Sequence, residues 1–187
     1  MTPRNTNGNS GKNPKDTVAA TTEDMPPADL YIDRMSASQA LAAMLANQAH
    51  AITALEAALP AIDAAADAAY QRLSTSDNGR LIYVGAGTSA RIGVQDGAEL
   101  PPTFNWPHHR IGFVIAGGEA ALLRAVENAE DSAETACAHI ADMGVAQNDV
   151  VIGLAASGST VFTTAALAAA GQAGAVTIGV ANNPDTA

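Results

Sequence analysis

The sequence is poor in aromatic residues and in lysine. Its 187 residues include three Phe, three Tyr and one Trp, so the core must be built mainly from Ala, Val, Ile and Leu. The two lysines, Lys12 and Lys15, lie near the N-terminus, and the formal net charge is −10. An acidic chain with so few basic residues is not suited to binding nucleic acid. These absences favour an α/β protein without a nucleic acid partner.

Cysteine and long apolar runs are also scarce. Cys137 is the only cysteine, which excludes an internal disulfide and agrees with a reducing compartment. Residues 1–24 are polar, read as a disordered tail, and contain no apolar run that could serve as a signal sequence. No stretch approaches the roughly 20 consecutive apolar residues that cross a bilayer. We therefore expect a cytoplasmic protein without a membrane partner.

A helical lead-in is predicted for residues 25–76. Ser36, with Gln39 three positions later, makes a capping box for a first helix. Pro60 ends this helix or begins the next, and apolar residues then recur at helical spacing up to about Leu73. We therefore expect a hairpin of two helices before the main domain.

The main domain, residues 77–187, alternates short β-branched runs with helical stretches, the pattern of βαβ units around a parallel sheet. We expect a three-layer αβα sandwich with a flavodoxin-like strand order. The predicted strands are 80–84, 110–115, 149–154 and 175–180, and the predicted helices are 88–99, 119–143, with a break near Asp131 left open, and 159–171. Because parallel strands need cover on both faces, we expect the C-terminal strand and helices to be missing here or supplied by a partner.

Two loops rich in glycine and hydroxyl groups follow the first and third predicted strands. Such loops can bind an anion, because backbone N–H groups and the positive end of a helix dipole favour phosphate. Loops at the carboxyl ends of parallel strands converge on the crevice where α/β sheets bind ligands. The candidate substrate-binding residues are Gly87, Thr88, Ser89, Ser157, Ser159 and Thr160, the last four for the phosphate and the first two for the rest of the ligand.

Two other readings of these loops stay open. The hydroxyls can be ordinary helix N-caps, with glycines that only permit tight turns. The stretch from Gly85 to Ala90 also fits the loose dinucleotide pattern G-x-G-x-x-A. That pattern expects an acidic residue about 20 positions later at the end of the next strand, and neither Glu99 nor Glu119 is so placed. Nicotinamide binding is therefore the weaker reading.

Several longer motifs occur together in this sequence: GRLIYVGAGTSARIGV at 79–94, DGAELPPTF at 96–104, IAGGEAAL at 115–122, RAVE at 124–127 and AASG at 155–158. With them, nearly the whole chain after about Thr21 resembles the N-acetylmuramic acid 6-phosphate etherases, a group within the sugar isomerase (SIS) fold. The sequence departs from the family at three positions. Ala90, Leu100 and Ser159 stand where the family usually has Gly, Cys and Arg.

The resemblance implies a carbon–oxygen lyase of peptidoglycan recycling. Such an enzyme cleaves the lactyl ether of N-acetylmuramic acid 6-phosphate, a phosphorylated amino sugar, to N-acetylglucosamine 6-phosphate and D-lactate by elimination and hydration. Glu99 and Glu119 match the family's catalytic glutamates, with Glu99 as the principal acid/base and Glu119 as its partner. By spacing alone, both also read as exposed charges at helix ends. The resemblance further implies a homodimer without a cofactor.

No metal is expected either, because no cluster of His, Cys and carboxylate residues has metal-ligand spacing.

Two rival functions stay open. One is a non-catalytic SIS domain that binds phosphosugars in a regulator, as in a relative of these etherases that controls a kinase. The other is an aldose–ketose isomerase, which also moves a C2 proton but releases no lactate.

Overall fold

A four-stranded parallel sheet forms the centre of the protein. The computed structural model describes residues 31–183, so the predicted tail, residues 1–24, lies outside it. The strands are β1 (Leu81–Gly85), β2 (Ile111–Ile115), β3 (Val150–Leu154) and β4 (Val176–Val180), in the order β2-β1-β3-β4. Both the flavodoxin-like order and the positions of the four strands are confirmed, the latter to within one residue at each end.

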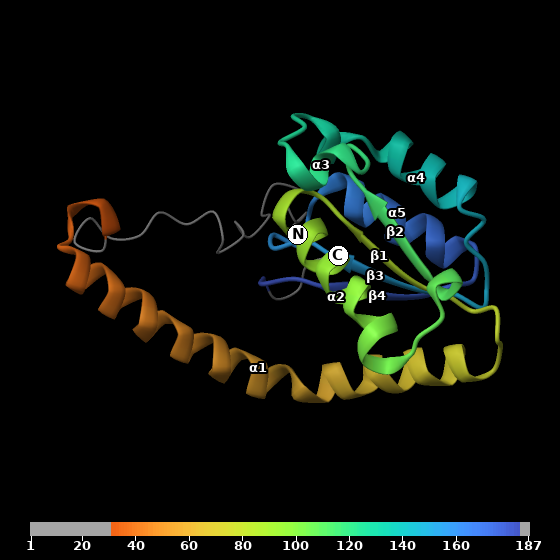
Figure 1. Cartoon of the computed structure of the whole chain (residues 1–187), viewed down its shortest axis with the longest axis horizontal. Coiled ribbons are helices and arrows are strands. Elements are labelled where there is room, and N and C mark those ends of the chain that lie inside the picture. The colour runs from red at the N-terminus through yellow and green to blue at the C-terminus, as the bar shows by residue number, and fades with distance from the viewer. Residues whose placement is uncertain (1–30, 184–187) are drawn as a thin grey trace, which may run out of the picture.

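Helices cover both faces of the sheet, which confirms the three-layer sandwich (Figure 1). Helices α4 (Ala133–Asp142) and α5 (Val161–Gln172) lie together on one face. Helix α2 (Gly87–Phe104) and the C-terminal part of α1 (Ala37–Ser74) lie on the other. The βαβ pattern of the sequence predicts this arrangement because parallel strands are apolar on both sides.

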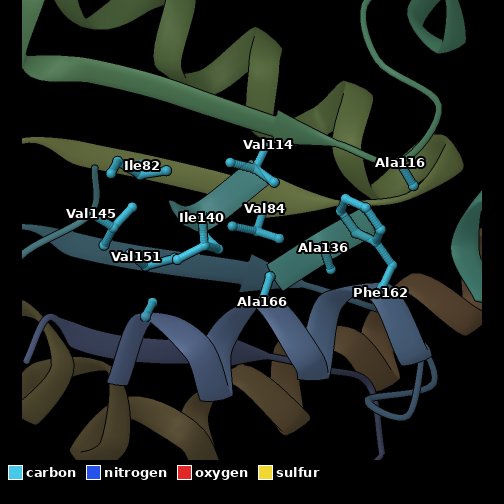
Figure 2. Packing of buried hydrophobic residues seen from close by; sticks show 11 residues of the cluster. Ile82, Val84, Val114, Ala116, Ala136, Ile140, Val145, Val151, Phe162 and Ala166 are labelled. Atoms are coloured by element: carbon cyan, nitrogen blue, oxygen red, sulfur yellow. The ribbon is translucent and has the colours of Figure 1, made fainter. Parts of the chain in front are cut away.

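The larger core cluster lies between the sheet, α4 and α5 (Figure 2). Phe162 of α5 is fully buried and is the largest side chain of this cluster. Alanines supply most of the remaining helix contacts, so the helices approach the strands closely and few aromatic side chains are needed. The other core members are Ile82, Val84, Val114, Ala116, Ala136, Ile140, Val145, Val151, Ala166 and Ala170.

Helix α2 also packs tightly against the sheet. A Cβ atom on Gly97 would lie 2.7 Å from Cε1 of Phe113, so a larger residue would have to displace this ring. The Tyr83 hydroxyl of β1 donates a 2.6 Å hydrogen bond to the Asp96 carboxylate of α2. Burial, together with this bond, raises the pKa of Tyr83. These contacts hold α2 against β1.

The predicted hairpin before the sheet is wrong, because α1 is a single helix of 38 residues that contains Pro60. Its capping box is confirmed: Ser36 Oγ accepts from Gln39 N–H, and the Gln39 side chain accepts from Ser36 N–H. Proline removes one helical hydrogen bond, but its neighbours are mostly alanine, the best helix former, and no turn residue adjoins it. No helix in residues 31–183 has the length and apolar character to span a membrane.

Two other helix predictions need correction. Helix α2 continues past Glu99 to Phe104 and ends where Asn105 adopts a left-handed conformation, with φ of 53°. The predicted helix 119–143 is three short elements: α3 (Ala120–Leu123), the 3-10 turn η5 (Ala129–Asp131) and α4. Apolar periodicity alone did not reveal the irregular segment between α3 and α4, although the break near Asp131 is present.

Candidate anion-binding site

A cavity of about 460 Å³ lies at the carboxyl edge of the sheet, where the loops after β1 and β3 meet. The two loops meet because β1 and β3 are paired neighbours, although Gly85 and Leu154 are far apart in the sequence. The cavity is lined by all six residues predicted to bind substrate: Gly87, Thr88, Ser89, Ser157, Ser159 and Thr160. The structure therefore gathers the predicted residues around one space.

The two helices that begin at this cavity have N-termini without a side-chain cap. Neither Ala86, the N-cap of α2, nor Thr160, the N-cap of α5, makes a side-chain capping bond. By contrast, Ser36 and Ser132 do cap α1 and α4, whose N-termini do not line the cavity. The alternative that the loop hydroxyls serve as helix caps is therefore not met at α2 or α5. Backbone N–H donors at both helix starts remain available for an anion.

The backbone of both loops is shaped around this space. Gly87 and Gly158 have φ values of 53° and 75°, a left-handed conformation that side chains disfavour. Ser157 Oγ accepts a 3.2 Å hydrogen bond from the Ser159 N–H. Asn183, which follows β4 and is 7% exposed, donates from its side-chain amide to the Ser157 carbonyl at 2.9 Å. Asn183 thus braces the second loop, a contact that sequence spacing did not predict.

The lining of the cavity carries no arginine or lysine among the described residues. Two acidic residues, Glu130 and Asp131 of η5, line the same space as Ser159. Sequence reasoning missed these two residues because they lay within the predicted helix 119–143, and the break near Asp131 did not indicate which space they would face. They belong to no group of three or more potential metal ligands within residues 31–183. An anion bound here would therefore rely on backbone N–H groups and hydroxyls.

The two candidate catalytic glutamates do not share this cavity within one chain. Glu99 is exposed and lies twelve residues after Gly87 in α2, about 18 Å along the helix axis. Glu119 is also exposed and lines a different cavity, of about 610 Å³, beside β2. The reason is topological: Glu119 follows β2, which pairs with β1 on the side away from β3, and α2 runs back from the carboxyl edge.

This fold and the cavity at its carboxyl edge define a sugar isomerase (SIS) domain. Residues 64–171 match the family model described as the glucokinase regulatory protein N-terminal SIS domain, and the chain belongs to this family. Phosphoheptose isomerase from Neisseria gonorrhoeae has a similar structure, with a TM-score of 0.59 over 78% of this chain and 75% of that chain. Its sequence identity is 22%, so this likeness concerns the fold alone.

The relatives in sequence are N-acetylmuramic acid 6-phosphate etherases, which confirms the resemblance predicted from the motifs. The etherase of Pasteurella multocida is 41% identical over 90% of this chain and 56% of its own length. The etherase of Deinococcus radiodurans is 42% identical over 87% of this chain and 53% of its own length. The chain therefore spans about half the length of the curated relatives it matches.

Proposed function

We propose that this chain acts as an N-acetylmuramic acid 6-phosphate etherase, a lyase that releases D-lactate in cytoplasmic recycling of cell-wall amino sugars. The observation that carries the proposal is the cavity at which α2 and α5 both begin without a side-chain cap. Two sets of backbone donors, with hydroxyls around them, suit the three terminal oxygens of a phosphate ester. The 41% identity to the etherase of Pasteurella multocida is the reason for proposing N-acetylmuramic acid as the sugar that carries this phosphate.

The proposed reaction needs one base and one acid. In the ring-opened sugar, the base removes the C2 proton, which the C1 aldehyde acidifies, while the acid protonates the ether oxygen at C3. The C3–O bond then breaks, D-lactate leaves, and water adds to the C2–C3 double bond to give N-acetylglucosamine 6-phosphate. Glu99 and Glu119 are proposed for these two steps. They would need different environments, since one must be protonated when the other is ionised.

The separation of Glu99 from Glu119 supports a homodimer in which the two chains complete each other's site. Helix α1 offers a surface for pairing: it has no buried residue, and its N-terminal part projects from the domain (Figure 1). Apolar residues recur along it at spacings of four, seven, three, four and three, which keep them on one face, as in paired helices. This α1 stripe is Leu41, Leu45, Ile52, Leu55, Leu59 and Ile62, each at least 47% exposed.

We expect a light-scattering mass of two chains at micromolar concentration. The double substitution Leu45→Glu, Ile52→Glu should shift this mass to one chain, because four buried carboxylates per dimer would face one another without partners. The sheet should stay folded, since neither side chain is buried in the single chain. Asn47→Glu, which adds charge on the opposite side of α1, should leave the dimer intact. A wild-type mass of one chain would contradict the pairing.

Incubation with N-acetylmuramic acid 6-phosphate and an enzymatic assay for D-lactate test the proposed activity directly. Release of one D-lactate per sugar supports the etherase. The cavity without a basic residue, with Ser159 at the family's arginine position, favours a second candidate, a phosphosugar-binding regulatory domain. That domain would bind the sugar phosphate in calorimetry and release no lactate. Interconversion of aldose and ketose phosphates, again without lactate, would identify an isomerase.

A further inference from the structure

A smaller cavity, of about 230 Å³, adjoins the anion-binding cavity. Both spaces are lined by Ala86, Gly87, Thr88 and Glu130, so the loop after β1 forms the wall between them. The outer wall of the smaller cavity is the irregular segment that follows α3. A ligand held in the first cavity can therefore extend into the second around this loop.

The smaller cavity contains the basic residues that the anion-binding cavity lacks. It is lined by Arg91 of α2 and by Arg124, the residue that ends α3. The Arg91 guanidinium is already engaged, because it donates to the carbonyls of Leu122 and Ala121 at 3.0 and 2.9 Å. Arg91 thus joins α2 to α3 and has a structural role.

The Arg124 side chain, unlike that of Arg91, is not engaged by the rest of the described structure. Its side chain is exposed, and among the described residues it makes no hydrogen bond or ion pair. A guanidinium offers five N–H donors in a planar arrangement that matches both oxygens of a carboxylate. Arg124 is therefore the one cationic group of the two cavities whose donors are free to bind a ligand within the part of the chain described here.

We propose that the smaller cavity is the subsite for the carboxylate of the lactyl ether and that Arg124 binds this carboxylate. The inference rests on the proposed function, whose substrate carries two anionic groups, a phosphate at C6 and a carboxylate on the C3 ether. With the phosphate at the starts of α2 and α5, the carboxylate needs its own cation. The same carboxylate distinguishes the substrate from the product, N-acetylglucosamine 6-phosphate, so Arg124 sets specificity.

The acidic neighbours of Arg124 sharpen this specificity. Glu127 and Glu130 also line the smaller cavity, and the whole chain carries a net charge of −10. Without the guanidinium, a ligand carboxylate would face these two side chains and be repelled. Removal of the Arg124 charge should therefore weaken binding of the lactyl ether more than the loss of hydrogen bonds alone.

Calorimetric titration with N-acetylmuramic acid 6-phosphate and, separately, with N-acetylglucosamine 6-phosphate tests the subsite without any turnover. Glu99→Gln serves as the background that prevents cleavage of the first sugar. On this background, the lactyl ether should bind more tightly than the sugar without it. Adding Arg124→Gln should lower the affinity for N-acetylmuramic acid 6-phosphate by about tenfold or more. The affinity for N-acetylglucosamine 6-phosphate should change by less than about twofold. Arg124→Lys should restore part of the preference.

Arg34→Gln is the matched control, since Arg34 is a distant exposed arginine that contacts the Tyr31 ring, and it should change neither affinity. Equal weakening of both sugars by Arg124→Gln would overturn the subsite, because it would show a structural or phosphate-binding role. No preference for the lactyl ether, including no binding of either sugar, would also overturn it. The wild-type protein could release no D-lactate and still prefer N-acetylmuramic acid 6-phosphate in a way that depends on Arg124. This result would support the subsite and contradict the etherase activity.

Discussion

Glu99→Gln should lower the rate of D-lactate release by about 10²- to 10⁴-fold, the contribution typical of a general acid or base. Glutamine keeps the shape of the side chain and removes its ability to transfer a proton. Because Glu99 is exposed on α2, the unfolding midpoint should stay unchanged. Glu134→Gln, an exposed acid in the first turn of α4, is the matched control and should keep wild-type activity. A wild-type rate in Glu99→Gln would remove this residue from the mechanism.

Mixing two inactive variants tests whether the glutamates meet across a dimer. When Glu99→Gln and Glu119→Gln chains are unfolded and refolded together, half of the dimers are mixed, and one site in each has both glutamates. We expect about a quarter of wild-type activity to return. If both glutamates of a site come from one chain, the mixture stays inactive. The same outcome is expected if the etherase assignment itself is wrong, and the wild-type assay separates these two explanations.

Asp149→Ala should lower the free energy of unfolding by about 3–5 kcal/mol, a large part of the 5–15 kcal/mol typical of a domain. The Asp149 side chain is 4% exposed and pairs with Arg80, Oδ2 to Nη2, at 2.7 Å. Its carboxylate also accepts from the backbone N–H groups of Arg80 and Ala146, at 2.9 and 3.0 Å. The residue thus joins the starts of β1 and β3, and its loss leaves the guanidinium without its counter-ion.

Urea denaturation at pH 7 measures this loss, with Asp142→Ala, an exposed acid of α4, as the control. Burial acts to raise the pKa of Asp149, but the hydrogen bonds from Arg80 and Ala146 outweigh it and lower the pKa below its ordinary 3.8. A carboxyl with a lowered pKa stabilises the fold above the unfolded pKa. The difference between wild type and Asp149→Ala should therefore shrink as the pH falls below 3.8. A difference under about 1 kcal/mol at pH 7 would contradict the structural role of the pair.

The strands and the two glycine loops could be predicted because their signals are local. Each strand is a short β-branched run; the first three runs lead into turns that contain glycine, and the fourth leads into Asn182-Asn183. The convergence of Ser89 and Ser157 on one cavity also followed, since the carboxyl ends of parallel strands share an edge. Pro60 misled the prediction, because a proline is a boundary signal only when its neighbours do not favour a helix.

What the amino-acid sequence determined by itself is the αβα architecture, the family and the set of residues at the starts of α2 and α5. What only the tertiary structure decided is which side chains surround each space. Strand order puts Glu119 on the far side of β1 from the second loop, and helix length carries Glu99 down α2. The irregular segment after α3 brings Arg124 and Glu130 to the cavities. These placements depend on contacts between distant segments, which local periodicity and propensity do not encode.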